Sequence, residues 1–309
     1  MNLFVFVQEA SQTAAADTAR QAVEHGAANG EHGAMSVSEI FQHLFEHVQD
    51  SRELELPFVG HVHLPQFDPI HIGGLTLDIS ITKHVVFLWV AAALLIILMG
   101  IAARANTKNR IPKGWGNLVE IFVKFIRDEI VVPNMGTAGL RYMPYVLSTF
   151  FFILIMNLLG LVPYGSSATG NISVTAGLAA IAFIMIQVAA IRAQGFGRYL
   201  AHLTGGVPVF LWPIMIPIEI LGLFTKPFAL CIRLFANMTG GHLVIVSLFG
   251  LIFLAKSYAI GVTTAAFVVA INFLELFVAF LQAYIFTMLT SIFMGLGIQA
   301  GHEAHGEHH

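Results

Sequence analysis

Apolar and polar stretches alternate along most of this chain. The pattern predicts membrane spans near residues 84–103, 144–164, 172–191, 207–255 and 258–298. The first holds twenty residues with no acidic, lysine or arginine side chain, about the number that a helix needs to cross roughly 30 Å of hydrocarbon. We therefore predict an all-α integral membrane protein with about five transmembrane helices, in a membrane domain over residues 83–299.

The last two stretches are too long for ordinary spans. Residues 258–298 contain no proline, which favours one strongly tilted helix. The stretch before it contains Pro208, Pro213, Pro217 and Pro227. These prolines predict bends in its first half. We expect a long, tilted, antiparallel pair whose surface lies against something curved.

The segment between the first two spans is amphipathic. Its apolar positions at helical spacing are Leu118, Ile121, Phe122, Phe125 and Ile126. With Trp115 as an interfacial anchor, they predict a helix near residues 115–132 that ends near Pro133 and lies along the cytoplasmic surface.

Residues 1–82 form a polar, acidic extension whose only basic side chains are Arg20 and Arg52. Ser36 and Glu39 are spaced as a capping box before a short helix. Residues 54–64 and 71–82 have the pattern of short strands, with a turn at residues 73–74. The apolar start at residues 1–7 is short and lacks a basic flank, so an uncleaved extension is the default over a signal peptide.

Composition agrees with a membrane protein. The 309 residues are 57% hydrophobic and 11% charged, whereas soluble domains are about a quarter charged. The single cysteine, Cys231, cannot form an internal disulfide. The acidic extension and the net charge of −3 predict no nucleic-acid partner.

Basic residues set the expected orientation, because short loops rich in lysine and arginine stay cytoplasmic. They follow the first span as Arg104, Lys108, Arg110 and Lys113. The predicted cytoplasmic loops also contain Arg141, Arg192 and Arg198. Only Lys256 lies in a loop that this orientation puts outside. We expect a multi-pass protein of a bacterial inner (plasma) membrane, with the N-terminus outside and a His-rich cytoplasmic tail at residues 300–309.

Five ionisable residues interrupt the last two apolar stretches. They are Glu219, Lys226, Arg233, His242 and Glu275. Each costs on the order of 3 kcal/mol in hydrocarbon, so such residues usually mark an ion or proton path. Ser257 lies between the last two stretches. Arg233 precedes it by about as many residues as Gln282 follows it, so in an antiparallel pair these two should lie at similar depth. The same count pairs His242 with Glu275. Glu219, Lys226 and Arg233 fall near one helix face, with Asn237 one turn beyond.

Structural roles stay open for several of these residues. Glu219 and Lys226 are spaced so that they can form an ion pair with each other. His242, considered without the other charged residues, would be interpreted as a hydrogen-bonded packing residue. Three amides fit interhelical hydrogen bonds better than ligand binding: Asn157, Gln187 and Asn272. Arg233 is harder to explain structurally, because a guanidinium does not neutralise itself by losing a proton.

Two motifs resemble a known family. The run 226–242 (KPFALCIRLFANMTGGH) and the run 281–286 (LQAYIF) closely resemble the hallmark of the a subunit in the membrane (Fo) sector of F-type ATP synthase. Residues 157–163 (NLLGLVP) are similar to that family's second-span motif. The resemblance covers roughly residues 84–299.

The resemblance implies a stator that passes protons through two half-channels to the carboxylates of a c-subunit ring. Arg233 would face the ring carboxylate with support from Gln282. His242 and Glu275 would line the outer half-channel, and Glu219 would belong to the inner one. Asn237 would also take part in proton translocation, with Lys226 and Asn157 in support. Implied partners are the c ring, b-type peripheral stalk subunits, the remaining ATP synthase subunits and membrane lipid.

No catalytic site or cofactor is predicted, since the chain has no Gly-x-x-x-x-Gly-Lys-Ser/Thr loop. His61 and His63, like the histidines of the tail, are assigned no metal. One alternative is a free-standing secondary transporter, although no internal repeat is evident. Another is a structural membrane anchor, which leaves Arg233 unexplained.

Overall fold

Five helices of the described chain are long and apolar enough to cross a membrane. They comprise Lys83–Asn106, Thr137–Gly160, Ile172–Gln194, Trp212–Leu248 and Gly261–Ala300. They confirm the predicted all-α integral membrane protein with about five spans. The computed structural model describes residues 53–56, 60–63, 70–72, 75–77, 82–108, 114–162, 167–203, 209–255 and 258–306.

The chain divides into two units, which are described separately. Unit 1 contains residues 1–89, 156–173 and 235–278, and unit 2 contains residues 90–155, 174–234 and 279–309. The helices α3 (Lys83–Lys108), α6 (Met143–Gly160), α7 (Ile172–Gln194), α9 (Trp212–Ala255) and α10 (Tyr258–Gly306) have residues in both units.

Unit 1 contains the only strands among the described residues. They are β1 (Glu53–Leu56), β2 (Gly60–His63), β3 (Ile70–Ile72) and β4 (Leu75–Leu77). The β3–β4 hairpin pairs Ile72 with Leu75, which agrees with a turn at residues 73–74. The strand pattern predicted over residues 54–64 corresponds to two strands, β1 and β2, which pair antiparallel with Leu56 opposite Gly60. The capping box at Ser36 lies outside the described residues.

The segment before α6 belongs to unit 2 and is helical over most of its length. It contains α4 (Trp115–Phe125), the π-helical turn η1 (Ile126–Val131), α5 (Val132–Met135) and the 3-10 helix η2 (Thr137–Tyr142). The helical run ends at Met135, close to the predicted end near Pro133. Pro133 lies in the first turn of α5, a position where a helix tolerates proline. The run is followed by Gly136, whose φ of 63° suits glycine.

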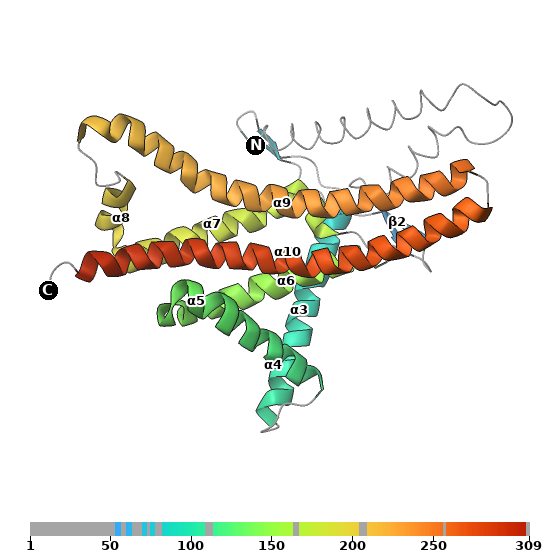
Figure 1. Ribbon diagram of the computed structural model, residues 1–309, viewed down its shortest axis with the longest axis horizontal. Coiled ribbons are helices and arrows are strands. Elements are labelled where there is room, and N and C mark those ends of the chain that lie inside the picture. The colour runs from blue at the N-terminus through green and yellow to red at the C-terminus, as the bar shows by residue number, and fades with distance from the viewer. Residues whose placement is uncertain are drawn as a thin grey trace. The chain divides into compact units, whose positions relative to one another are not determined.

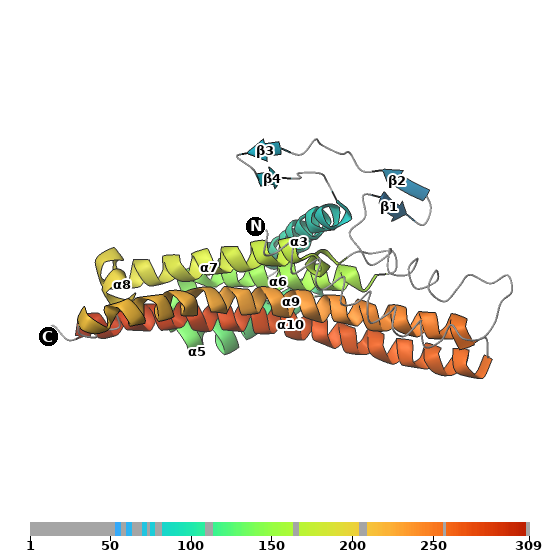
Figure 2. The same cartoon turned by 90° about the horizontal axis from the view of Figure 1, so that it is seen from above.

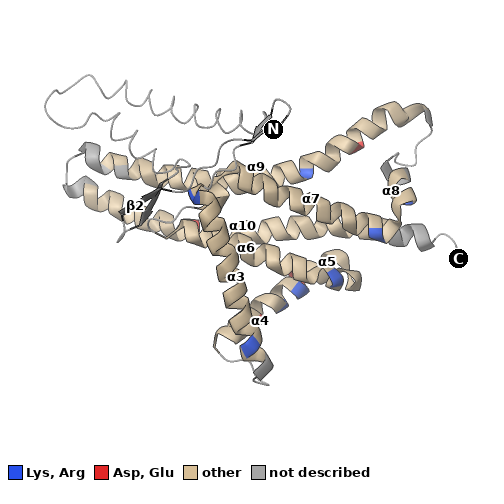
Figure 3. Ribbon diagram, turned by 180° about the vertical axis from the view of Figure 1, so that it is seen from behind, with Lys and Arg blue, Asp and Glu red and all other residues tan. Residues whose placement is uncertain are grey.

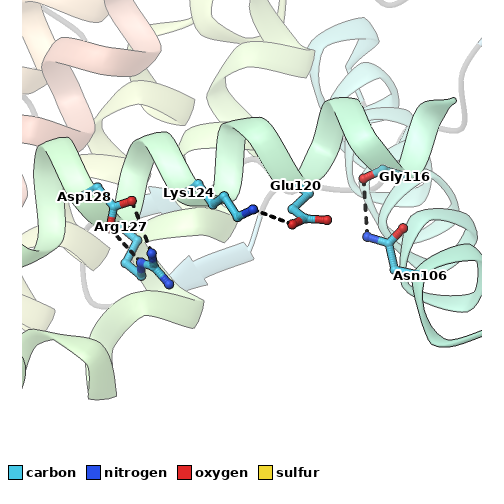
Figure 4. Close-up of polar contacts among 6 residues, drawn as sticks. All are labelled: Asn106, Gly116, Glu120, Lys124, Arg127 and Asp128. Atoms are coloured by element: carbon cyan, nitrogen blue, oxygen red, sulfur yellow. Dashed lines mark hydrogen bonds and ion pairs between the residues drawn. The ribbon is translucent and has the colours of Figure 1, made fainter. Parts of the chain in front are cut away.

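Helix α4 has the expected polar and apolar faces. Figure 4 shows its polar side, where the Lys124 ammonium lies 2.7 Å from the Glu120 carboxylate. At its start, Gly116 accepts a hydrogen bond of 3.3 Å from the Asn106 side chain of α3. On the other side, the Phe122 ring lies 6.0 Å from those of Phe150 and Phe280. These aromatic contacts bind α4 to α6 and α10.

Three short elements follow α6 and α7. They are the 3-10 helix η3 (Ala168–Gly170), α8 (Phe196–Leu203) and the 3-10 helix η4 (Val209–Leu211). Gly195 between α7 and α8 has a φ of 80°, a left-handed conformation that glycine adopts without steric cost. The chain therefore turns sharply from α7 into α8.

The two long helices α9 and α10 run antiparallel, as predicted (Figures 1 and 2). Helix α9 starts at Trp212 rather than residue 207, and it contains Pro217 and Pro227. Its first part curves in Figure 1, where these prolines interrupt the backbone hydrogen bonding. Helix α10 has no proline and continues into the His-rich tail.

Close backbone contacts hold α10 in unit 2. A Cβ atom on Gly295 would overlap the Asn134 carbonyl oxygen of α5, and one on Gly297 would lie 2.7 Å from the Ala190 Cβ of α7. The Gln194 side chain also donates a hydrogen bond of 2.9 Å to the Gly297 carbonyl. Glycine at these two positions lets the helices approach closely.

Candidate functional site

In unit 1, His242 of α9 and Glu275 of α10 lie side by side. The His242 Nδ1 is 3.9 Å from the Glu275 Oε1, close enough for electrostatic attraction but too far for a hydrogen bond. Only 26% of the His242 side chain and 11% of the Glu275 side chain are exposed. The buried His242 Nδ1 has no hydrogen-bond partner among the described residues. The predicted pairing of these two residues is confirmed.

The adjacent Gly241 makes room for this pair. A Cβ atom at Gly241 would overlap the carboxylate of Glu275, whereas one at Gly240 would have nothing within 4 Å. The Glu275 carboxylate therefore occupies the space that any larger residue at Gly241 would fill.

A second polar group in unit 1 lies around Asn157, near the end of α6. The Thr169 hydroxyl donates a hydrogen bond of 2.8 Å to the Asn157 Oδ1. The Ser167 hydroxyl lies 2.7 Å from that of Thr169, and the His84 Nδ1 lies 3.0 Å from the Ser167 carbonyl. Because a carbonyl only accepts, His84 donates through Nδ1. All four side chains are buried.

His84, Ser167 and Thr169 were not predicted as site residues. His84 stands at the start of the first span, where a polar residue looks like an ordinary helix flank. Its contact with Ser167 joins positions 83 residues apart in the chain. No local sequence pattern signals such a contact.

In unit 2, Glu219 and Lys226 lie on a half-buried face of α9. The Lys226 Nζ is 4.9 Å from the centroid of the Phe293 ring of α10, a cation–π contact. Among the described residues, no ion pair joins Glu219 to Lys226, so the open alternative that they pair with each other is not what the structure shows.

Arg233 also belongs to unit 2, but its side chain is exposed, while Leu230 and Leu234 beside it are buried. It makes no ion pair with any residue that the structure describes. Figure 3 shows how few charged residues lie along α9 and α10. An arginine on such an apolar surface is expected to meet a group of opposite charge.

Gln282 and Asn237 differ in exposure. Gln282 of α10, in unit 2, is only 2% exposed, and Asn237 of α9, in unit 1, is exposed. Asn272, by contrast, donates to the Val268 carbonyl of its own helix. The described residues that were searched contain no group of three or more His, Cys, Asp or Glu side chains placed to hold a metal ion.

Comparison with known proteins identifies the family. The profile of the family described as ATP synthase A chain matches residues 85–295. ATP synthase subunit a of Chloroherpeton thalassium is 52% identical over 264 residues, which cover 84% of this chain and 77% of that protein. ATP synthase subunit a of Myxococcus xanthus is 52% identical over 282 residues, or 83% of this chain and 93% of that protein. The chain therefore belongs to the ATP synthase A chain family, the family of the membrane-embedded, proton-translocating subunit a.

Proposed function

We propose that this chain is the stator proton channel of a rotary ATP synthase. Two half-channels would carry protons to and from the carboxylates of a c-subunit ring, and the ring's rotation would couple ion flow to ATP synthesis. The observation that carries the proposal is Arg233, a permanent cation exposed on the apolar surface of α9 with no described acidic partner.

Arg233 would act on the ring by electrostatics. A carboxylate in a bilayer prefers its protonated form, and a nearby fixed cation favours the ionised form instead. Arg233 supplies this field without carrying protons itself, so it would also block a direct leak between the half-channels. Gln282 would support the guanidinium.

The outer half-channel would be lined by His242 and Glu275. Both side chains titrate, they lie within 3.9 Å of each other, and the His242 Nδ1 has no hydrogen-bond partner among the described residues. Asn157 and Asn237 would supply further polar groups to this half-channel. Glu219, with Lys226 in support, would belong to the inner half-channel, which opens to the cytoplasm.

Orientation and partners follow from the charge pattern and the family. Basic residues at the end of α3 and after it favour a cytoplasmic loop there, which would place the N-terminus outside and the tail inside a bacterial plasma membrane. The exposed surface around Arg233 would contact the c ring, and b-type stalk subunits would hold the chain as a stator. ATP chemistry would take place on other subunits.

Purification of the tagged chain tests the proposal. A stator subunit should copurify with a c ring and with soluble ATPase subunits, and liposomes that contain the chain alone should not couple proton flow to work. A chain that copurifies with neither and catalyses ion exchange by itself would instead be a secondary transporter.

The Gly241→Ala variant should slow proton entry while the complex still assembles. The new methyl group must displace the Glu275 carboxylate, which is the flexible end of its side chain, away from His242. We expect proton flux in membrane vesicles to fall about tenfold, less than the ~10²–10⁴ typical of losing a general acid or base.

Gly240→Ala is the matched control, because a Cβ atom there meets nothing within 4 Å. His242→Ala and Glu275→Ala should lower flux in the same direction as Gly241→Ala. Equal fluxes for the two glycine variants, or unchanged flux in His242→Ala and Glu275→Ala, would contradict the assignment of the outer half-channel.

A further inference from the structure

Helix α8 lies at the end of unit 2 where α7 ends and α9 begins (Figures 1 and 2). The left-handed Gly195 reverses the chain between α7 and α8, and its N–H donates to the Ile191 carbonyl at 2.8 Å. The Tyr199 N–H then donates to the Gly195 carbonyl at 3.0 Å. This turn sets the direction of the Tyr199 side chain back toward α7.

The Tyr199 hydroxyl of α8 donates a hydrogen bond to the Gln187 Oε1 of α7, 12 residues earlier in the chain. Both side chains are half-buried. Gln187 was expected to serve as an interhelical amide, and it does join α7 to α8. Because the hydroxyl proton is held by Gln187, the lone pairs of the phenol oxygen remain as acceptors for another group.

Glu219 of α9 lies at a depth similar to that of Gln187. The Phe183 ring of α7, four residues before Gln187, stacks at 5.4 Å against the Phe224 ring of α9, five residues after Glu219. The pKa of Tyr199 is raised above its ordinary value, first by burial and second by the negative charge of Glu219. Tyr199 therefore stays neutral at physiological pH and keeps its proton. No hydrogen bond between Tyr199 and Glu219 is among the described contacts, and a water molecule can bridge two polar groups that do not bond to each other directly.

Few other charges surround this pair in unit 2. Lys226 lies two turns further along α9, with its ammonium over Phe293. Arg192 belongs to the last turn of α7, and Arg198 precedes Tyr199 on α8. Residues 279–300 of α10 carry no acidic, lysine or arginine side chain. Among the described side chains of α7, α8 and the unit 2 parts of α9 and α10, Glu219 is the only acidic one.

We propose that Tyr199, held by Gln187, is the positioning residue through which Glu219 exchanges its proton with the inner aqueous phase. The inference rests on the proposed function. The O–H bond of the Glu219 carboxyl breaks, the proton passes to water held by the Tyr199 oxygen and then to the inner bulk phase, and a carboxylate remains. Phenylalanine at this position would keep the ring and remove the group that holds the water.

The test uses the whole complex reconstituted in liposomes, with proton flux measured while the pH on each side is varied separately. Tyr199→Phe should lower flux on the order of tenfold, below the loss typical of a proton-carrying residue. It should change the dependence on inner pH and leave the dependence on outer pH as in the wild type. Tyr142→Phe, the same substitution elsewhere in unit 2, should change neither.

A double-mutant cycle adds a readout that simple anchoring of α8 would not give. Gln187→Leu should reproduce the altered inner-pH profile, and the double variant with Tyr199→Phe should lose no more flux than either single variant. Unchanged flux in Tyr199→Phe, or equal changes in the inner and outer profiles, would overturn the assignment. Failure of the channel function itself is recognised separately, because Arg233→Ala would then retain synthesis.

Discussion

Replacing Arg233 with alanine should abolish proton-driven ATP synthesis while the subunit still assembles. The side chain is exposed and has no described acidic partner, so its removal leaves no buried charge unpaired and no cavity in the packing of α9. The function should fail nonetheless, because the ring carboxylate would lose the fixed cation that favours its ionised form. We expect a loss of at least about a hundredfold, the scale for removing a preorganised charge-stabilising group from a water-poor site.

The measurement is ATP synthesis in inverted vesicles, with the c ring quantified in the purified complex. Arg141→Ala removes an exposed arginine of η2 instead and should leave synthesis near the wild-type rate. Arg233→Lys keeps the charge but not the planar guanidinium, so it should retain less synthesis than the wild type. Normal synthesis in an assembled Arg233→Ala complex would refute the role of Arg233.

The Gly295→Ala variant should have the largest effect on stability. A Cβ atom at this position would overlap the carbonyl oxygen of Asn134, which is backbone and cannot rotate away as a side chain can. Overpacking of this kind typically costs about 1–3 kcal/mol. The gain in helix propensity from glycine to alanine is about 1 kcal/mol at most, so the steric term should win.

Thermal unfolding of the purified complex and the yield of assembled subunit both report this effect. Gly261→Ala is the control in the same helix, because a Cβ atom there meets nothing within 4 Å. That variant should be neutral or slightly stabilised. A Gly295→Ala complex with a wild-type melting temperature would show that α5 and α10 do not approach each other as closely as described.

Much of the architecture was predictable because the bilayer imposes simple rules. A run of about 20 apolar residues is long enough to span, and this alone located five helices. Equal rise per residue in two antiparallel helices makes depth countable from their connection. The count that matched His242 with Glu275 therefore found a pair that lies 3.9 Å apart.

Predictions that depended on the face of a helix were weaker. Glu219, Lys226 and Arg233 are spaced by seven, and an α-helix drifts about 20° per heptad from such a repeat. Glu219 and Lys226 are half-buried, whereas Arg233 is exposed. The spacing suggested a common face, but the drift and the bends of α9 give these residues different environments.

Hydrophobicity and counting along a helix were enough to predict the class of protein, the number of spans, the antiparallel pair and the proximity of His242 to Glu275. Only the tertiary structure decided which groups touch: Lys226 with Phe293, Tyr199 with Gln187, and His84 with Ser167. Such contacts depend on how helices rotate and pack against one another, and packing is a property of pairs of surfaces that no single stretch of the chain encodes.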